Sequence, residues 1–151
     1  MPRKILGAIV GYIAMAIVLM ITFTILFLIL GTEGAFKPNE FNPSATWVAG
    51  TLVLSIVAAV IGGWVCVLIA RSAKTATILA GIVLVLGLIL AIPQLTAEPS
   101  TELRAGDLES FEAMQKGTQP AWVSLLNPFI GAAGIMLGAR FRKSDDGAVR
   151  P

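Results

Sequence analysis

Four long apolar stretches without a charged side chain limit what this chain can fold into. They cover residues 5–30, 46–70, 75–92 and 121–139. As α-helices they would be about 27 to 39 Å long, which suits a hydrocarbon core of about 30 Å. Buried strands are usually shorter, and half-buried strands alternate in polarity. Because a backbone in lipid must satisfy its own hydrogen bonds, we predict that each stretch is a transmembrane helix.

The composition supports this class of protein. Hydrophobic residues make up 56% of the 151 residues and charged residues 13%, whereas about a quarter of the residues of a soluble domain are charged. This excludes a soluble globular protein, a disordered chain and a nucleic-acid-binding protein. We predict an all-α, polytopic four-transmembrane-helix bundle that forms a single membrane domain over residues 1–151. Its longer connections are 31–45 and 93–120, and its tail is 140–151.

The first apolar stretch is either a membrane helix or a cleaved signal peptide. Arg3 and Lys4 resemble the basic start of a leader. The apolar part of a signal peptide is about 7 to 15 residues long and precedes a small-residue cleavage site. Here the uncharged apolar run covers 5–30 and no such site follows it. We therefore predict that this segment is retained as a membrane helix.

Basic residues are distributed unevenly between the two sides of the predicted bundle. Eight lie at the N-terminus, in the 71–74 connection and in the tail, and three lie in 31–45 and 93–120. Loops that face the cytoplasm are enriched in Lys and Arg. We therefore predict a multi-pass protein of the bacterial cytoplasmic (inner) membrane. Both termini and the 71–74 turn would face the cytoplasm.

The two connections on the opposite side carry aromatic residues and a further predicted helix. Ser44 is expected to cap the second membrane helix. Four aromatic residues lie near this membrane boundary: Phe36, Phe41, Trp47 and Trp122. They are either interfacial anchors, which we favour, or a ligand-binding cluster. Residues 107–116 have the pattern of a short amphipathic helix, which either lies on the membrane surface or docks a partner.

The fourth apolar stretch is interrupted by Asn127 and Pro128. Proline removes a backbone donor and clashes with the carbonyl group four residues earlier. Either the span is kinked there, or Asn127 caps a new helix that begins at Pro128. The part after Pro128 is too short to cross a bilayer alone, so we predict a kinked span. Broken helices also build transporter sites, but a structural kink is the favoured interpretation.

Small residues recur at the spacing that lets membrane helices approach closely. Lipid tails are as apolar as leucine, so close packing and not hydrophobic exclusion holds such helices together. The packing candidates are Gly7, Gly11, Gly62, Gly63, Gly134 and Gly138. They serve either packing within one chain, which we favour, or dimerisation. We expect the cytoplasmic side to be the tighter one. The other side would be more open, near Thr22, Thr24, Thr51 and Asn127.

The residues that usually carry chemistry are missing from the membrane helices. The chain has no histidine and one cysteine, Cys66, which excludes an imidazole metal site and an internal disulfide. No charged residue lies inside a span, although such charges usually mark proton and ion pathways. The acidic residues between 98 and 112 lack a metal-binding spacing. We therefore predict no catalytic, cofactor-binding or metal-binding residues, and no enzyme.

Four segments give the chain a family resemblance: Lys4–Tyr12, Gly34–Pro38, Gly62–Cys66 and Val83–Pro93. In these segments it resembles small four-helix bacterial inner-membrane proteins of uncharacterised activity. The resemblance covers roughly the membrane part of the chain. It implies a fold and a location, and it transfers no activity and no residue role.

These observations leave two functional hypotheses open. The leading one is a non-catalytic integral membrane protein, an accessory or structural subunit of a larger membrane complex. It would contact the lipid bilayer, and other membrane subunits through its small-residue helix faces or the 107–116 helix. The alternative is a small transporter or channel for a neutral or lipidic solute that passes near Asn127. A membrane enzyme ranks last, and no nucleic-acid partner is expected.

Overall fold

The computed structural model describes residues 2–38, 40–96 and 119–148, and this part is helical almost throughout. Its helices are α1 (Pro2–Ala35), α2 (Ala45–Ala70), α3 (Ala73–Thr96) and α5 (Ala121–Ala148). All four are long and apolar enough to span a membrane. The predicted class, an all-α four-helix membrane bundle, is confirmed. The short helix predicted over 107–116 lies outside the described residues.

The helices extend beyond the apolar stretches that predicted them. α1 begins at Pro2 and ends at Ala35, and α5 continues to Ala148. Residues 140–148, expected as part of a tail, are therefore helical. Charged residues stop a segment from being buried in lipid, but Arg and Lys are good helix formers and let the helix continue into water.

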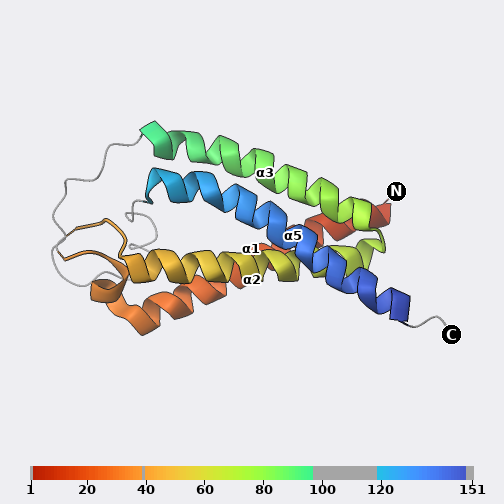
Figure 1. Cartoon of the computed structure of the whole chain (residues 1–151), viewed down its shortest axis with the longest axis horizontal. Helices are drawn as coiled ribbons and strands as arrows, with labels where there is room; N and C mark the ends of the chain where they lie inside the picture. The colour runs from red at the N-terminus through yellow and green to blue at the C-terminus, as the bar shows by residue number, and fades with distance from the viewer. Residues whose placement is uncertain (1, 39, 97–118, 149–151) are drawn as a thin grey trace.

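The helices pack in the order α1, α2, α5, α3 around the bundle. α2 packs along both α1 and α5, and α5 packs along α3. Contacts of α3 with α1 and α2 are sparse, and the backbones of α1 and α5 stay apart. Figure 1 shows both termini at one end of the bundle, where α2 also meets α3. We call this the terminal end, and the opposite end, which carries residues 36–38 and 40–44 and the start of α5, the loop end.

Small residues form the contact between α1 and α2 at the terminal end. A methyl group at Gly7 would lie 2.7 Å from Cβ of Ala70. One at Gly11 would lie 2.7 Å from Cβ of Cys66, and one at Gly62 would lie 2.9 Å from the Gly11 carbonyl oxygen. The two backbones therefore approach closely, which is the way helices associate where lipid offers no hydrophobic drive.

The contact between α2 and α5 is closer still. A methyl group at Gly63 would overlap the carbonyl oxygen of Ile135, and one at Gly138 would overlap that of Val60. At Gly134 it would lie 2.6 Å from Cβ of Ala59. Such a separation brings Cα–H groups against carbonyl oxygens of the facing helix, a contact that recurs at helix interfaces. The glycines on both helices are what permits this crossing.

The connection between α1 and α2 is a compact loop. Gly31 has φ 64° and ψ 179°, a backbone conformation that is essentially restricted to glycine. The last turn of α1 therefore changes direction there. The loop is closed by the Ser44 N–H, which donates to the Ala35 carbonyl at 2.9 Å. The Ser44 hydroxyl oxygen accepts the N–H of Trp47 at 3.0 Å. The predicted N-cap of the second helix is therefore confirmed.

The aromatic residues near the loop end divide into two groups. Phe36 and Phe41 are each only 5% exposed, and their rings meet edge to face at 6.3 Å. The prediction that these two are interfacial anchors is therefore wrong, because the loop folds over its own aromatic side chains. Trp47 packs edge to face against Phe27 at 6.1 Å. Trp122 is 57% exposed and stays a predicted anchor.

The α2–α5 crossing gives the first testable prediction. We expect Gly63→Ala to lower the free energy of unfolding in detergent by about 1–3 kcal/mol, because the added methyl forces the helices apart. The melting temperature should fall accordingly. Gly81→Ala on α3 is the matched control, since nothing lies within 4 Å of a methyl group there. The control should be neutral or stabilising by up to about 1 kcal/mol, the gain in helix propensity. Equal melting temperatures for both variants would contradict this packing.

Candidate binding cavity

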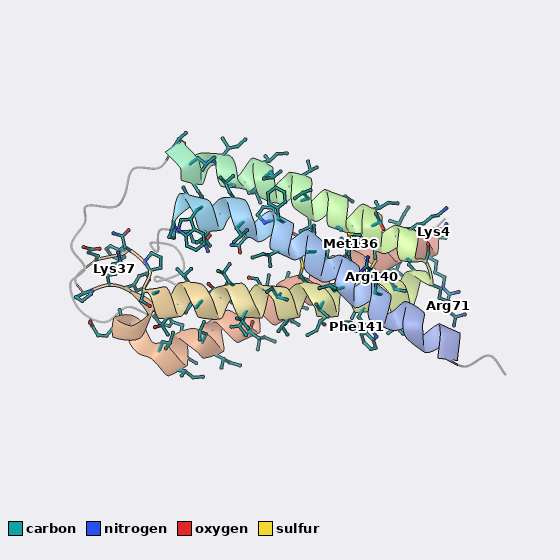
Figure 2. All side chains as sticks on the ribbon, viewed as in Figure 1. Lys4, Lys37, Arg71, Met136, Arg140 and Phe141 are labelled. Atoms are coloured by element: carbon teal, nitrogen blue, oxygen red, sulfur yellow. The ribbon has the colours of Figure 1, made fainter. Side chains whose placement is uncertain are left out.

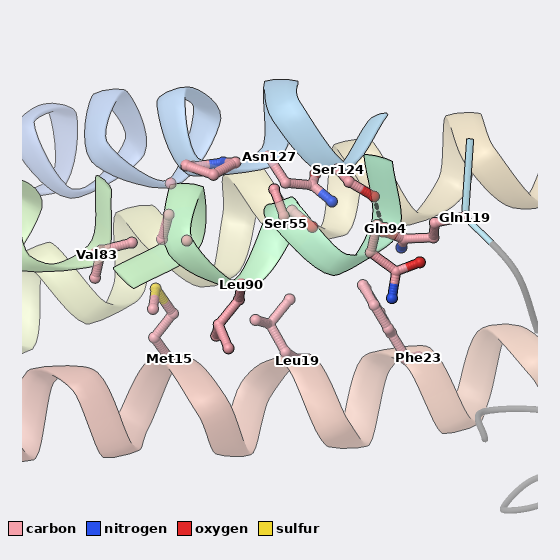
Figure 3. A pocket seen from close by; sticks show the side chains of 15 residues that line it. Met15, Leu19, Phe23, Ser55, Val83, Leu90, Gln94, Gln119, Ser124 and Asn127 are labelled. Carbon is pink, nitrogen blue, oxygen red and sulfur yellow. Dashed lines mark hydrogen bonds between the residues drawn. The ribbon is translucent and has the colours of Figure 1, made fainter. Parts of the chain in front are cut away.

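A cavity of about 360 Å³ lies between the helices toward the loop end. It exists because the backbones of α1 and α5 stay apart and α3 touches α1 only sparsely. Three residues of α1 form its floor in Figure 3: Met15, Leu19 and Phe23. α3 contributes Val83, Gly87, Leu90, Ala91 and Gln94. The remaining lining residues come from α2, from α5 and from Gln119 just before α5.

Most of the cavity wall is apolar, and no charged side chain of the described residues lines it. Met15 is 8% exposed and belongs to the core cluster that also contains Ala59 and Ile135. The larger apolar side chains of the wall come from α1 and α3, and α2 contributes the small residues Ser55 and Ala59. The cavity is therefore suited to an uncharged molecule, since an ion placed here would lose its hydration without a compensating charge.

The polar groups of the cavity gather toward the loop end, as Figure 3 shows. They are the side chains of Ser55, Gln94, Gln119, Ser124 and Asn127. The Ser124 hydroxyl donates to the Gln119 amide oxygen at 3.5 Å. Asn127 lies six residues after the start of α5, about 9 Å along the helix axis. The cavity thus has an amide-rich end and an apolar remainder.

The amide oxygen of Asn127 is buried and has no hydrogen-bond partner among the described residues. Figure 3 shows this side chain at α5, beside those of Ser55 and Ser124. Leaving a buried polar atom unpaired costs about 1–3 kcal/mol. Buried polar atoms are nearly always paired, so the Asn127 oxygen is an unusual and destabilising feature of this wall.

Pro128 lies next to Asn127 and fixes where α5 meets α3. A methyl group at Gly87 would lie 2.7 Å from Cγ of Pro128, so the proline ring occupies the space that a side chain on α3 would fill. α5 runs through Pro128 as one helix from Ala121 to Ala148. The alternative of a new helix that begins at Pro128 is therefore wrong. The continuous span is as predicted, and its kink at Asn127–Pro128 stays a prediction.

The threonines expected to mark an open region do not line the cavity. The hydroxyl groups of Thr22, Thr24 and Thr51 donate to carbonyl oxygens of their own helices, at 2.7, 2.8 and 3.0 Å. Threonine commonly satisfies its hydroxyl in this way in a helix. Of the polar residues singled out in the sequence, only Asn127 lines the cavity.

Sequence reasoning did not identify four polar lining residues: Ser55, Gln94, Gln119 and Ser124. Gln94 and Gln119 flank the long polar connection and look like ordinary loop residues. Their membership in one site depends on α3 packing against α5, which hydropathy does not reveal. The six packing glycines lie away from this cavity, in the α1–α2 and α2–α5 contacts. In the described part of the chain, no three His, Cys, Asp or Glu side chains group as a metal site would require.

Comparison with known proteins gives no match to a family model, to a curated protein or to a solved structure. The function must therefore be argued from the geometry of the cavity itself.

Asn127 gives the second prediction. We expect Asn127→Leu to stabilise the purified protein in detergent by about 1–3 kcal/mol, and so to raise its melting temperature, because it removes an unpaired buried oxygen while keeping the branched shape of the side chain. Thr24→Val is the control, since it removes an exposed polar group that is bonded within α1. A lower melting temperature for Asn127→Leu than for Thr24→Val would show that the amide is satisfied and structural.

Proposed function

We propose that this chain is a non-catalytic integral membrane protein that binds an uncharged amphipathic molecule in the cavity toward its loop end. The observation that carries the proposal is the combination of an apolar wall and an amide-rich end in one cavity. Binding sites for small molecules are typically apolar with a few polar groups that fix orientation. Amide groups both donate and accept hydrogen bonds, which suits a neutral polar headgroup.

The proposal develops the hypothesis of a transporter or channel for a neutral or lipidic solute, in preference to the accessory-subunit hypothesis. The latter depended on small-residue faces that another subunit would contact, or on the 107–116 helix, which lies outside the described residues. The structure uses all six packing glycines for contacts within the chain, so they are not available to a partner. Beyond the cavity, toward the terminal end, the helices are in close contact at Gly11, Gly62 and Gly63. This supports a binding site that ends inside the bundle and argues against a pore that passes through it.

We further propose that the terminal end faces the cytoplasm of a bacterial cell and that the protein lies in the inner membrane. Figure 2 shows Lys4, Arg71 and Arg140 toward this end and Lys37 at the opposite end. Basic residues are retained on the cytoplasmic side of multi-pass proteins. The charge distribution along the bundle supports this orientation, with the cavity then nearer the outer surface.

The binding proposal is tested by extracting the purified protein with organic solvent and measuring co-purified neutral small molecules by mass spectrometry. We expect the native protein to retain such a species, and Ser55→Phe to lose most of it because the added ring fills the cavity. Val53→Phe is the control, because Val53 lies on the same helix with its side chain 59% exposed. Identical extracts from the native protein and Ser55→Phe would refute the proposal.

The orientation is tested with single cysteines in a chain where Cys66 is replaced by Ala. A membrane-impermeant maleimide should label Glu40→Cys in intact cells, whereas Ser72→Cys should react only after lysis. Glu40 suits this purpose because it is exposed and acidic residues contribute little to membrane orientation. The reverse pattern of labelling would place the terminal end outside.

A further inference from the structure

A second cavity, of about 210 Å³, lies between α1 and α3 toward the terminal end. It is lined by Ala8, Ile9, Tyr12 and Ile13 of α1 and by Leu79, Ile82 and Leu86 of α3. On α1, Ala8 and Tyr12 precede Met15, Leu19 and Phe23 of the first cavity at steps of three or four residues. Residues at this spacing lie on one helix face, so the two cavities share one stripe of α1.

The two cavities lie along a seam where α1 and α3 face each other without packing closely. α1 is held by α2 and α3 is held by α5, while contacts between α1 and α3 are sparse. Tyr12, Ile82 and Leu86 remain 46%, 44% and 47% exposed. We call this the α1–α3 seam: the surface formed by the residues that line the two cavities on these helices. It is open at the lipid-facing side of the bundle.

The α1–α3 seam has the length of a lipid chain and a polar end. From Ala8 to Phe23 it extends about 22 Å along α1, which is about three-quarters of the hydrocarbon core. Its part toward the terminal end is lined almost entirely by apolar groups, and its part toward the loop end reaches the amides of Gln94 and Asn127. Among the described residues, neither cavity is lined by a charged side chain.

We propose that the α1–α3 seam holds a neutral lipid taken laterally from the bilayer, with its acyl chain along Tyr12, Met15 and Leu86 and its uncharged headgroup at the Gln94–Asn127 end. This rests on the proposed binding function and names its ligand class. The surrounding bilayer supplies such a molecule without passage through water. A helix of another protein fits less well, because membrane helices associate through small residues and this surface carries Ile, Leu and Tyr.

The test uses a monoacylglycerol with a photoreactive diazirine in its tail, incorporated with the full-length protein into phosphatidylcholine nanodiscs. After illumination, mass spectrometry should locate the label on α1 near Tyr12 and on α3 near Leu86. A fatty acid with the same tail and an ionised carboxylate should label these positions much less. Equal labelling by the two probes would overturn the assignment of an uncharged headgroup.

Two substitutions on α1 test the position of the tail. Ala8→Trp, which places an indole in the seam, should lower labelling about tenfold, the loss expected when two methylene groups lose their apolar contact. Ala16→Trp is the matched control, because Ala16 is exposed on the same helix and lines neither cavity. Ile82→Trp repeats the test from α3, starting from a side chain that is already large and exposed.

The outcomes separate this inference from the proposed function. If Ser55→Phe abolishes labelling while Ala8→Trp and Ile82→Trp leave it unchanged, the cavity binds its ligand but the tail does not follow the seam, and the inference is overturned. Label spread equally over exposed positions such as Val53 would overturn both proposals. Cross-linking of two copies of the chain through the seam would identify a protein helix as the occupant and would also overturn the inference.

Discussion

Close backbone contact through glycine is the interaction on which the rest of this structure depends. Inside a bilayer the lipid tails match the side chains in polarity, so helices gain little from hiding apolar surface from one another. The glycines of α1, α2 and α5 instead allow carbonyl oxygens and small side chains of neighbouring helices to meet. Because these contacts converge on α2, α1 and α5 occupy different sides of it. The backbones of α1 and α5 consequently cannot meet, and the space between them becomes the cavity.

The position of α3 follows from a different contact and leaves one side of the bundle open. Gly87 accommodates the ring of Pro128, which holds α3 against α5. No comparable set of small residues joins α3 to α1, where Ile9, Tyr12 and Ile82 face each other across the second cavity. Large branched side chains keep helices apart while remaining compatible with lipid. The same rule that closes the α2–α5 crossing therefore leaves the α1–α3 seam accessible from the bilayer.

The features that the sequence predicts well are those set by local composition. Hydropathy locates the membrane helices, and Ser44 identifies the start of α2, because both depend on a few adjacent residues. Features set by the choice of helix neighbours were not predictable. Phe36 and Phe41 look like interfacial anchors until the loop folds around them, and Gln94 looks like a loop residue until α3 packs beside α5. Asn127 was singled out both for its effect on helix geometry and as a residue near which a solute would pass, and the structure places it in the cavity wall.

Asn127 and Pro128 connect packing and binding in two adjacent residues. The proline ring fits against Gly87 and sets the approach of α3, and the neighbouring amide is thereby held in a mainly apolar wall. An apolar side chain of similar shape would be more favourable for folding, since it would leave no unpaired oxygen. A site that retains the amide lowers its own stability in the empty state. The amide is therefore retained at a cost to folding, in the part of the cavity wall where the proposed site has its polar end.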